Sequence, residues 1–370
     1  MPSRCGRRPH PPASRVGRIA LALLPLSLVA IATGCAQLGY YAHLARGQME
    51  LLSQREPIAQ IVGDERRDPE LRRRLTLVLD ARRFAVRDLQ LPDNPSYTLY
   101  ADLQRAYAVW NVLATPEFSL APLESCFPIA GCVAYRGHYS RERAEAQAQA
   151  LREQGHDVDI GGVPAYSTLG WFDDPVLNTM LHWSDAVLVA TVFHELVHQQ
   201  LYVSDDTVFN ESMARFVEQQ GLREYFTAGR IDETDSALQR ERQQQFTHLV
   251  LDARERLSRL YAQPLSNEIM RKRKAEEFQR LKAEYAELRD TRWNGDGDYD
   301  GWFARDLNNA SLLSFGLYDE YVPAFESLYD VSGRDWHRFH AACRELGNLP
   351  GPTRRLRLQS LMQYRSAESD

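Results

Sequence analysis

A five-residue pattern, His194-Glu195-Leu196-Val197-His198, constrains this 370-residue chain more than any other feature. It directly follows the apolar run 186–193, which has the length and composition of a buried helix. Two histidines four residues apart then lie on one face of that helix. Buried polar groups are costly unless they have a partner. A pattern this short also arises by chance on metal-free helices, but its apolar setting favours a bound metal. Zinc is the metal typical of this spacing.

The third ligand should come from the next helix, because catalytic zinc sites usually use three protein ligands and keep one position open. A helix is expected over residues 209–218, with Asn210 as its N-cap. It carries two glutamates, Glu211 at its start and Glu218 further along. The residues alone leave both open as ligands.

Glu195 lies between the two histidines and is the expected general base. Zinc would lower the pKa of a bound water and polarise a substrate carbonyl. Glu195 would take the proton of that water and later pass it to the leaving amine. The expected reaction is therefore hydrolysis of an amide bond.

The local sequence Asn210-Glu211-Ser212-Met213-Ala214 resembles the N-E-x-x-A pattern of gluzincin metallopeptidases. In those enzymes, H-E-x-x-H is followed by a glutamate ligand on the next helix. The resemblance assigns Glu211 as the third zinc ligand. Glu218 has the spacing seen in thermolysin-like enzymes but lacks this context. The connection from His198 to Glu211 is shorter than in those families, so their substrate clefts are not carried over.

A longer resemblance covers nearly the whole chain. Besides the zinc pattern it includes residues 126–132, 162–175, 308–310 and 322–326, which are similar to zinc aminopeptidase lipoproteins of Gram-negative bacteria. The resemblance implies a helix-rich α+β fold, with a gluzincin-like core and an edge strand before the zinc helix. It also implies a peptide substrate and the activity of an aminopeptidase, although the family's peptidase label itself rests largely on the zinc motif.

The same resemblance suggests further site residues. An extended substrate would pair with an edge strand over residues 164–168, which places Ala165, Tyr166 and Ser167 at the substrate. The alternative is that Tyr166, Trp171 and Phe172 pack in the core beneath the site. From the C-terminal part, Tyr321 is the candidate for polarising the scissile carbonyl.

The N-terminus has the composition of a targeting segment. Five arginines precede an apolar stretch, residues 19–33, and no acidic residue occurs before Glu50. The segment ends at Gly34-Cys35, which resembles a bacterial lipobox. We expect a signal peptide over residues 1–34, cleavage before Cys35 and lipidation of Cys35. Ala36 favours the outer membrane, by resemblance to other lipoproteins, with the body facing the periplasm. An uncleaved membrane anchor is the alternative, and the short apolar run argues against it.

Loss of the five arginines changes the formal net charge from −6 to −11. An acidic body without a basic block is a poor nucleic-acid binder, so no nucleic-acid partner is expected. Attachment to a membrane should rest on the lipid.

Cysteine usage agrees with an envelope location. Cys126 and Cys132 flank a short segment, and in an oxidising compartment we expect a disulfide between them. The alternative, a structural metal pair, lacks further cysteines or histidines at close spacing. Cys343 is expected to be a small buried residue.

The mature body, residues 35–370, is expected to have four parts. They are N-terminal helices (35–90), an α/β catalytic core (91–225), a long helical hairpin broken near Pro264 (235–290) and a helical C-terminal part (300–350). Strands are expected over 97–101, 106–113 and 157–161, and a helix over 140–154. Two other functions remain open: a non-catalytic zinc-binding envelope protein, and a zinc hydrolase acting on cell-wall peptides.

Overall fold

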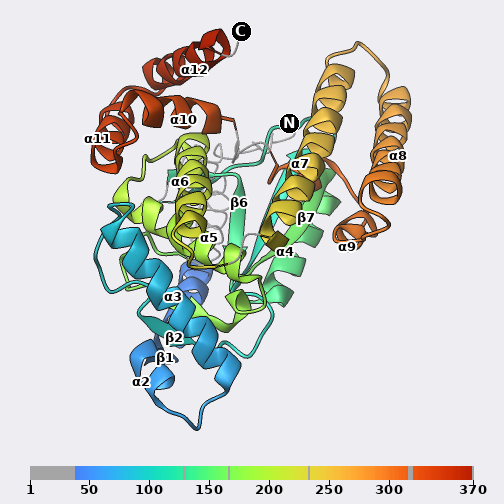
Figure 1. Cartoon of the computed structure of the whole chain (residues 1–370). Coiled ribbons are helices and arrows are strands. Elements are labelled where there is room, and N and C mark those ends of the chain that lie inside the picture. The colour runs from blue at the N-terminus through green and yellow to red at the C-terminus, as the bar shows by residue number, and fades with distance from the viewer. Residues whose placement is uncertain (1–37, 128–130, 166, 232–233, 316–319, 369–370) are drawn as a thin grey trace, which may run out of the picture. The chain divides into compact units, whose positions relative to one another are not determined.

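The computed structural model describes residues 38–127, 131–165, 167–231, 234–315 and 320–368 (Figure 1). The chain divides into two compact units, residues 1–50 and 51–370. In the first unit, residues 38–50 are helical. The expected lipidation site Cys35 lies outside the described residues, as does Tyr166. No helix of the described part has both the length and the apolar character that crossing a membrane requires.

The described part of the second unit is a helix-rich α+β structure with three small sheets, which confirms the expected α+β class. One sheet has the order β1-β2-β8 and consists of Arg55–Pro57, Leu99–Ala101 and Val176–Leu177. Within it, β2 is antiparallel to β1 and parallel to β8. The sheet lies in the largest core, to which Ala101 and Leu177 contribute fully buried side chains.

The second sheet has the order β6-β3-β7 and is antiparallel throughout. Its strands are β3 (Val109–Pro116), β6 (Tyr135–His138) and β7 (His156–Val163). Helix α4 (Arg141–Glu153) begins after the N-cap Ser140 and packs its buried residues Ala144 and Ala148 against the sheet. Among the described residues β7 pairs only with β3, so it is an edge strand of this sheet, and it precedes the zinc-pattern helix in the chain.

Two strands and one expected edge lie elsewhere than the sequence predicts. Strands β2 and β3 begin two and three residues later than expected, at Leu99 and Val109. Residues 164, 165, 167 and 168 are not in a strand, so the expectation of a strand over residues 164–168 is wrong for the described residues, and β7 ends before them, at Val163. The physical reason is that Pro164 and Thr168 use their polar groups within the protein. The Pro164 carbonyl accepts a hydrogen bond from Thr179, and Thr168 bonds to Asp174.

The main core lies between helices. Its largest contributors are α3 (Pro69–Arg87), α5 (Asp185–Gln200) and α6 (Thr207–Thr227), with α10 (Val322–Val331) and α11 (Trp336–Gly347) from the C-terminal part. Three further elements contribute to this main core: α2 (Ile58–Gly63), the short 3-10 helix Asn178–Met180 and α12 (Gly351–Glu368). Helix α12 lies beyond the C-terminal part that the sequence indicated.

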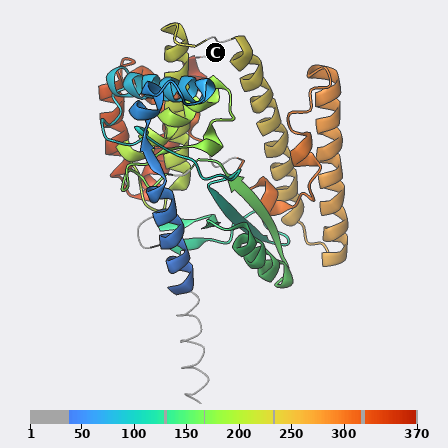
Figure 2. The same cartoon turned by 90° about the horizontal axis from the view of Figure 1, so that it is seen from below.

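The expected helical hairpin is confirmed. Helix α7 (Thr234–Tyr261) and helix α8 (Asn267–Arg292) run side by side in both views (Figures 1 and 2). They enclose a separate aromatic core with α9 (Asp300–Phe303) and the 3-10 helix Asn309–Leu312. Lys274 on α8 forms an ion pair with Asp157 at 2.5 Å, which fixes the hairpin to β7.

Candidate metal centre

Helix α5 carries the zinc pattern and is apolar around most of its circumference. It begins after Ser184, whose hydroxyl accepts a hydrogen bond from the Val187 N–H. Leu188, Val192 and Phe193 are completely buried, and both α3 and α6 pack against the helix. A helix that is apolar all round is stable only in the interior. The polar residues at its C-terminal end are therefore held at the depth of the core.

Helix α6 begins earlier than expected. Its N-cap is Asp206, whose carboxylate accepts a hydrogen bond from the Phe209 N–H, so the expectation that Asn210 is the N-cap is wrong. The Asn210 side chain instead binds the connection between the helices. It accepts from the Val203 N–H and donates to the Val203 carbonyl, both at 2.8 Å. This two-bond contact fixes how far apart the ends of α5 and α6 lie.

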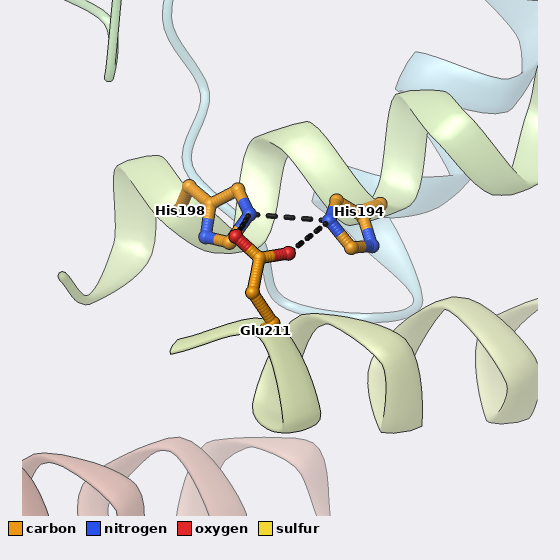
Figure 3. Close-up of side chains that lie close together, drawn as sticks. All are labelled: His194, His198 and Glu211. Atoms are coloured by element: carbon orange, nitrogen blue, oxygen red, sulfur yellow. Dashed lines mark hydrogen bonds and ion pairs between the residues drawn. The ribbon is translucent and has the colours of Figure 1, made fainter. Parts of the chain in front are cut away.

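Three of the expected residues converge. His194 and His198 point from α5 toward Glu211 on α6 (Figure 3). The two histidine Nε2 atoms are 3.2 Å apart, and Glu211 Oε2 lies 3.2 Å from His194 Nε2. Glu211 Oε1 lies 3.7 Å from His198 Nε2. Donor atoms around a tetrahedral zinc ion are about 3.3 Å apart, given metal–ligand distances near 2.0–2.1 Å. The three residues could therefore hold a metal ion.

Glu218, the rival ligand, lies on the other side of His194. Its Oε2 is 3.1 Å from His194 Nδ1, the nitrogen that faces away from the convergence point. Arg215 holds the second oxygen of Glu218 at 2.5 Å. A histidine that binds a metal usually donates its other ring N–H to such a carboxylate, which fixes the tautomer and the ring orientation. In contrast, the buried His198 Nδ1 has no hydrogen-bond partner among the described residues.

The charges at the site are mutually dependent. Burial alone would lower the pKa of His194, but its hydrogen bonds to Glu211 and Glu218 outweigh burial and raise it to about 10. Burial would raise the pKa of Glu211, and the two histidines outweigh it and lower that pKa. In the absence of a metal, His194 is therefore held as a cation between two carboxylates.

Glu195 differs from the other two glutamates of the site. Among the described residues it makes no hydrogen bond and no ion pair, whereas Glu211 and Glu218 each make several. Burial raises the pKa of Glu195, and the neighbouring histidines partly offset this effect. A glutamate with a raised pKa and a free carboxylate is suited to accept and return a proton.

Sequence reasoning did not identify three neighbours of the metal group. The hydroxyl of the fully buried Tyr97 has no partner of normal hydrogen-bond geometry among the described residues. Burial raises its pKa, and the charge of Glu195 raises it further. The ring of Tyr202 packs 6.4 Å from that of His198. Asp174, which is 1% exposed, organises the turn beside the zinc helix. None of these residues belongs to the H-E-x-x-H pattern, and only the fold brings them close.

The remaining expected residues lie elsewhere or outside the described part. The Tyr321 N–H binds the hydroxyl of Ser212, the neighbour of Glu211. Its own hydroxyl is bonded to Glu320, and no described contact joins it to the metal group. Ala165 packs against the main core, and the Ser167 hydroxyl lies 3.2 Å from Asp174.

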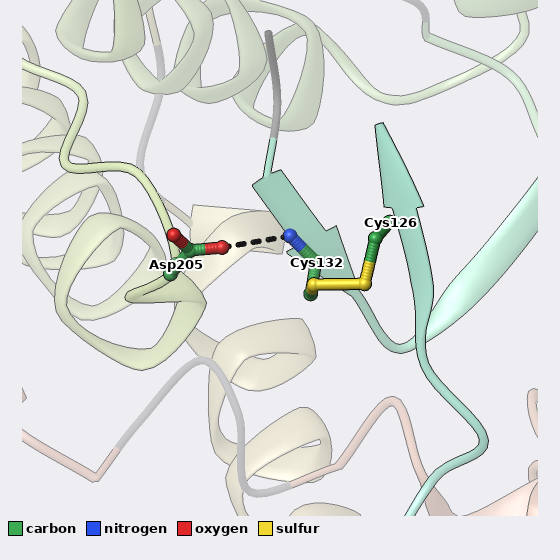
Figure 4. Close-up of a disulfide and its surroundings, with 3 residues drawn as sticks. All are labelled: Cys126, Cys132 and Asp205. Atoms are coloured by element: carbon green, nitrogen blue, oxygen red, sulfur yellow. Dashed lines mark hydrogen bonds between the residues drawn. A yellow bond between two sulfur atoms is a disulfide. The ribbon is translucent and has the colours of Figure 1, made fainter. Parts of the chain in front are cut away.

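Cys126 and Cys132 form a disulfide that joins β4 (Ser125–Phe127) to β5 (Gly131–Val133) (Figure 4). The Cys132 N–H donates to Asp205 at 2.8 Å, in the connection between the two ligand helices. Gly131 is required here, because it has a φ of +72° and a Cβ would lie 2.3 Å from the Asp205 carboxylate. The disulfide hairpin therefore contacts the connection between His198 and Glu211. Cys343 is buried and free.

Comparison with known proteins identifies a family. The sequence model of the family described as "putative aminopeptidase" matches residues 39–358. The chain belongs to this family. No curated protein and no solved structure matches it. Membership of the putative aminopeptidase family indicates a peptidase, and the His194–His198–Glu211 group lies inside the matched range.

Proposed function

We propose that the chain is a zinc-dependent peptidase with a gluzincin-like core, and that it acts as an aminopeptidase. One observation carries the proposal. Two histidines and a glutamate converge at metal-binding distances, and a glutamate with a free carboxylate lies between the histidines on the same buried helix. A purely structural zinc site does not require Glu195. The family match adds the peptidase class.

His194, His198 and Glu211 would hold the metal. When bound, zinc supplies Lewis acidity, which polarises a carbonyl and lowers the pKa of water. Glu195 accepts the proton of the attacking water and returns it to the leaving amine. Glu218 holds the ring of His194 through Nδ1, and Arg215 holds Glu218.

The substrate backbone is proposed to pair with the free edge of β7. The Val163 carbonyl bonds to the Ala108 N–H, so Val163 directs its backbone groups toward β3. Because backbone groups alternate along a strand, those of Ile160 and Gly162 point away from β3. Asn308 already binds the outward carbonyl of Val158 at 3.1 Å. The edge open to a peptide is therefore short, and it leads through Ala165 and Ser167 toward α5.

The cellular location remains part of the proposal. Residues 1–34 would be a signal peptide, and lipidated Cys35 would anchor the body to the outer membrane, facing the periplasm. Mass spectrometry of the mature N-terminus tests this. A lipidated Cys35 is the expected first residue, and an intact Met1 in the membrane fraction would contradict the proposal.

The function is tested with a mixed peptide library and the full-length, zinc-loaded protein. Mass spectrometry should show single residues leaving from peptide N-termini. Glu195→Gln should retain zinc, measured by elemental analysis, and lose activity by about 10²–10⁴-fold, the usual contribution of a general base. Hydrolysis by Glu195→Gln at the wild-type rate would contradict the mechanism. Zinc binding without hydrolysis by the wild type would favour a non-catalytic zinc protein, and cleavage confined to cell-wall peptides would identify the other alternative.

A further inference from the structure

Residues 167–174, here called the aromatic loop, are organised around one buried carboxylate. Asp174 is 1% exposed and accepts hydrogen bonds from the Thr168 N–H at 2.9 Å and from the Thr168 hydroxyl at 2.6 Å. The Ser167 hydroxyl (3.2 Å) and the Gly170 N–H (3.3 Å) donate to it as well. A carboxylate that accepts several hydrogen bonds from one loop fixes the path of that loop.

The backbone of the aromatic loop is held in uncommon conformations. Leu169, Gly170 and Asp173 have φ values of 58°, 80° and 49°. For residues other than glycine this region costs roughly 1–2 kcal/mol each, so the surrounding contacts must stabilise it. Arg55 adds such contacts, because its guanidinium donates to the Phe172 carbonyl at 2.6 Å and to the Asp173 carbonyl at 3.3 Å. The loop is therefore held both by the Asp174 carboxylate and by the bonds of Arg55 to the Phe172 and Asp173 carbonyls.

The fixed loop exposes two aromatic rings. Trp171 is 68% exposed and Phe172 is 49% exposed, so neither packs in the core. Single exposed apolar residues are ordinary, but adjacent large rings on a held loop form an apolar surface for another molecule. Rigid aromatic side chains are effective contacts because little conformational entropy is lost when they bind.

The aromatic loop lies on the catalytic face of the zinc helix. A Cβ added to Gly170 would lie 3.2 Å from the side chain of Gln199, so the loop packs directly on that residue. Asn94 holds the same Gln199 side chain at 2.6 Å. Glu195 and Gln199 are four residues apart on α5, and residues at this spacing lie one above the other on a helix. The loop is therefore about one helical turn from Glu195.

We propose that Trp171 and Phe172 form a binding site for an apolar or aromatic side chain of the peptide substrate. This inference rests on the proposed peptidase function and adds a substrate class to it. A substrate backbone that follows β7 reaches the aromatic loop next, because the loop continues from that strand. The rings then contact a side chain while Glu195 acts on a neighbouring peptide bond.

The charge around the loop favours a peptide over a lipid surface as its partner. No lysine or arginine occurs between residues 153 and 214, and two acidic residues, Asp173 and Asp174, directly follow the rings. Protein segments that bind anionic membranes are usually rich in lysine and arginine. Arg55 is the basic side chain bonded to this loop, and it is engaged by loop carbonyls.

The test compares the wild type with the double variant Trp171→Ala/Phe172→Ala, each as full-length, zinc-loaded protein in lipid nanodiscs. Substrates are matched peptides with leucine or phenylalanine, or with serine or asparagine, at each position. In the double variant, kcat/KM for the apolar peptides should fall about 10- to 100-fold, the effect of losing one buried apolar contact, and mainly through KM. Peptides with polar side chains should be cleaved as before.

Two controls separate a binding role from a general effect. Ile269→Ala/Leu356→Ala removes apolar side chains of comparable exposure (47% and 68%) from α8 and α12 and should leave the preference unchanged. The exchange variant Trp171→Phe/Phe172→Trp keeps two aromatic rings in the loop and should retain the wild-type preference for apolar peptides. An unchanged preference in the double alanine variant, with an unchanged unfolding temperature, overturns the proposal.

Direct binding keeps this inference separable from the proposed function. In the Glu195→Gln background, phenylalanine-containing peptides should change the tryptophan fluorescence, and Trp171→Phe should abolish that change. This readout decides the aromatic site even when the wild type cleaves no peptide, a result that would count against the peptidase alone. Quenching of Trp171 by brominated lipids in the nanodiscs, without a response to peptides, would identify a membrane contact and overturn the proposal.

Discussion

Two pairs of consecutive helices in this molecule use their interiors differently. Helices α5 and α6 are joined by residues 201–206 and, among buried aliphatic and aromatic side chains, place His194, Glu211 and Glu218 between them. Helices α7 and α8 are joined by residues 262–266 and bury aromatic rings such as Phe246 and Phe278. The charged residues between the helices of the second pair form ion pairs with one another. Arg256, for example, bridges Glu277 and Glu284 at 2.8 Å each.

The difference shows how charge placement separates a site from a scaffold. In α7 and α8 the ion pairs are partly solvated and locally complete, so they require no additional partner. In α5 and α6, three carboxyl groups and two imidazoles share a buried space, where their charges are stable only as a cluster or around a cation. Substitutions in α5 and α6 should therefore affect metal binding, and substitutions in α7 and α8 should affect only the stability of the fold.

The largest effect is expected from loss of a ligand. Glu211→Ala should weaken zinc binding by at least about 100-fold, because it removes both a ligand atom and the negative charge that balances the ion. Competition with a chromophoric chelator measures the affinity. A zinc affinity equal to that of the wild type would show that Glu211 is not a ligand. It would also contradict the expectation that α5 and α6, unlike α7 and α8, determine metal binding.

A smaller loss of zinc affinity is expected when the carboxylate that contacts His194 Nδ1 is removed. Glu218→Ala should weaken zinc binding about 10- to 100-fold, the usual effect of losing an outer partner of a ligand. Glu218→Gln, which can still accept from His194 Nδ1, should recover part of the loss. Glu224→Ala is the matched control on the same helix, since Glu224 binds Tyr329 and Trp336 instead. An equal effect in the control would show that α6 is only generally weakened.

Proton release should accompany metal binding. Since the pKa of His194 is raised to about 10 without metal, zinc must displace a proton from it at pH 8. Calorimetry in buffers of different ionisation enthalpy should detect about one proton, and zinc affinity should rise with pH up to about 10. No proton release at pH 8 would show that His194 is already neutral in the metal-free protein.

The same pKa shifts determine the stability of the metal-free protein. The raised pKa of His194 stabilises it fully below the unfolded-state value of 6.5, and this contribution is lost as pH rises toward about 10. The lowered pKa of Glu211 stabilises the protein above its ordinary value of 4.5, and this contribution is lost in acid. Thermal unfolding of the metal-free protein should therefore show highest stability between these two pH values.

The smallest effect is expected in the hairpin. Arg256→Ala removes two partly exposed ion pairs and should lower the free energy of unfolding by about 1 kcal/mol. Zinc affinity should not change. A parallel loss of zinc affinity would mean that the two helix pairs are not independent.

The sequence predicted the structure best in long helices, where an apolar pattern repeats over several turns or where residue spacing places side chains on one face. The hairpin, α3 and the buried zinc helix follow directly from apolar periodicity and helix boundaries, and His194 and His198 converge because of their spacing on one helix. Local patterns were less reliable. Asn210 has the residue type of an N-cap, but Asp206 takes that position because it begins the helical turn four residues earlier.

Contacts between distant segments could not be read from the sequence. Glu218 was a rival ligand by spacing, and only the packing of α6 on α5 shows that it faces His194 Nδ1. The exposure of Trp171 and Phe172 depends on hydrogen bonds within the loop to Asp174. The place of Tyr97 beside Glu195 depends on a backbone bond to Asp174, 77 residues later. Such relations are set by tertiary packing, which has no local sequence period.

The two hydrogen bonds between Asn210 and Val203 have a consequence for redesign of this protein. They fix Val203, in the connection between the ligand helices, to the first turn of α6. The length of this connection therefore cannot vary freely, although the connection contains no metal ligand. An extra residue between Leu201 and Val203, inside the connection, should leave the two helices intact but displace Glu211 from the histidines. Such an insertion should abolish metal binding in a chain that still folds, and would provide a metal-free scaffold with every ligand still in its sequence.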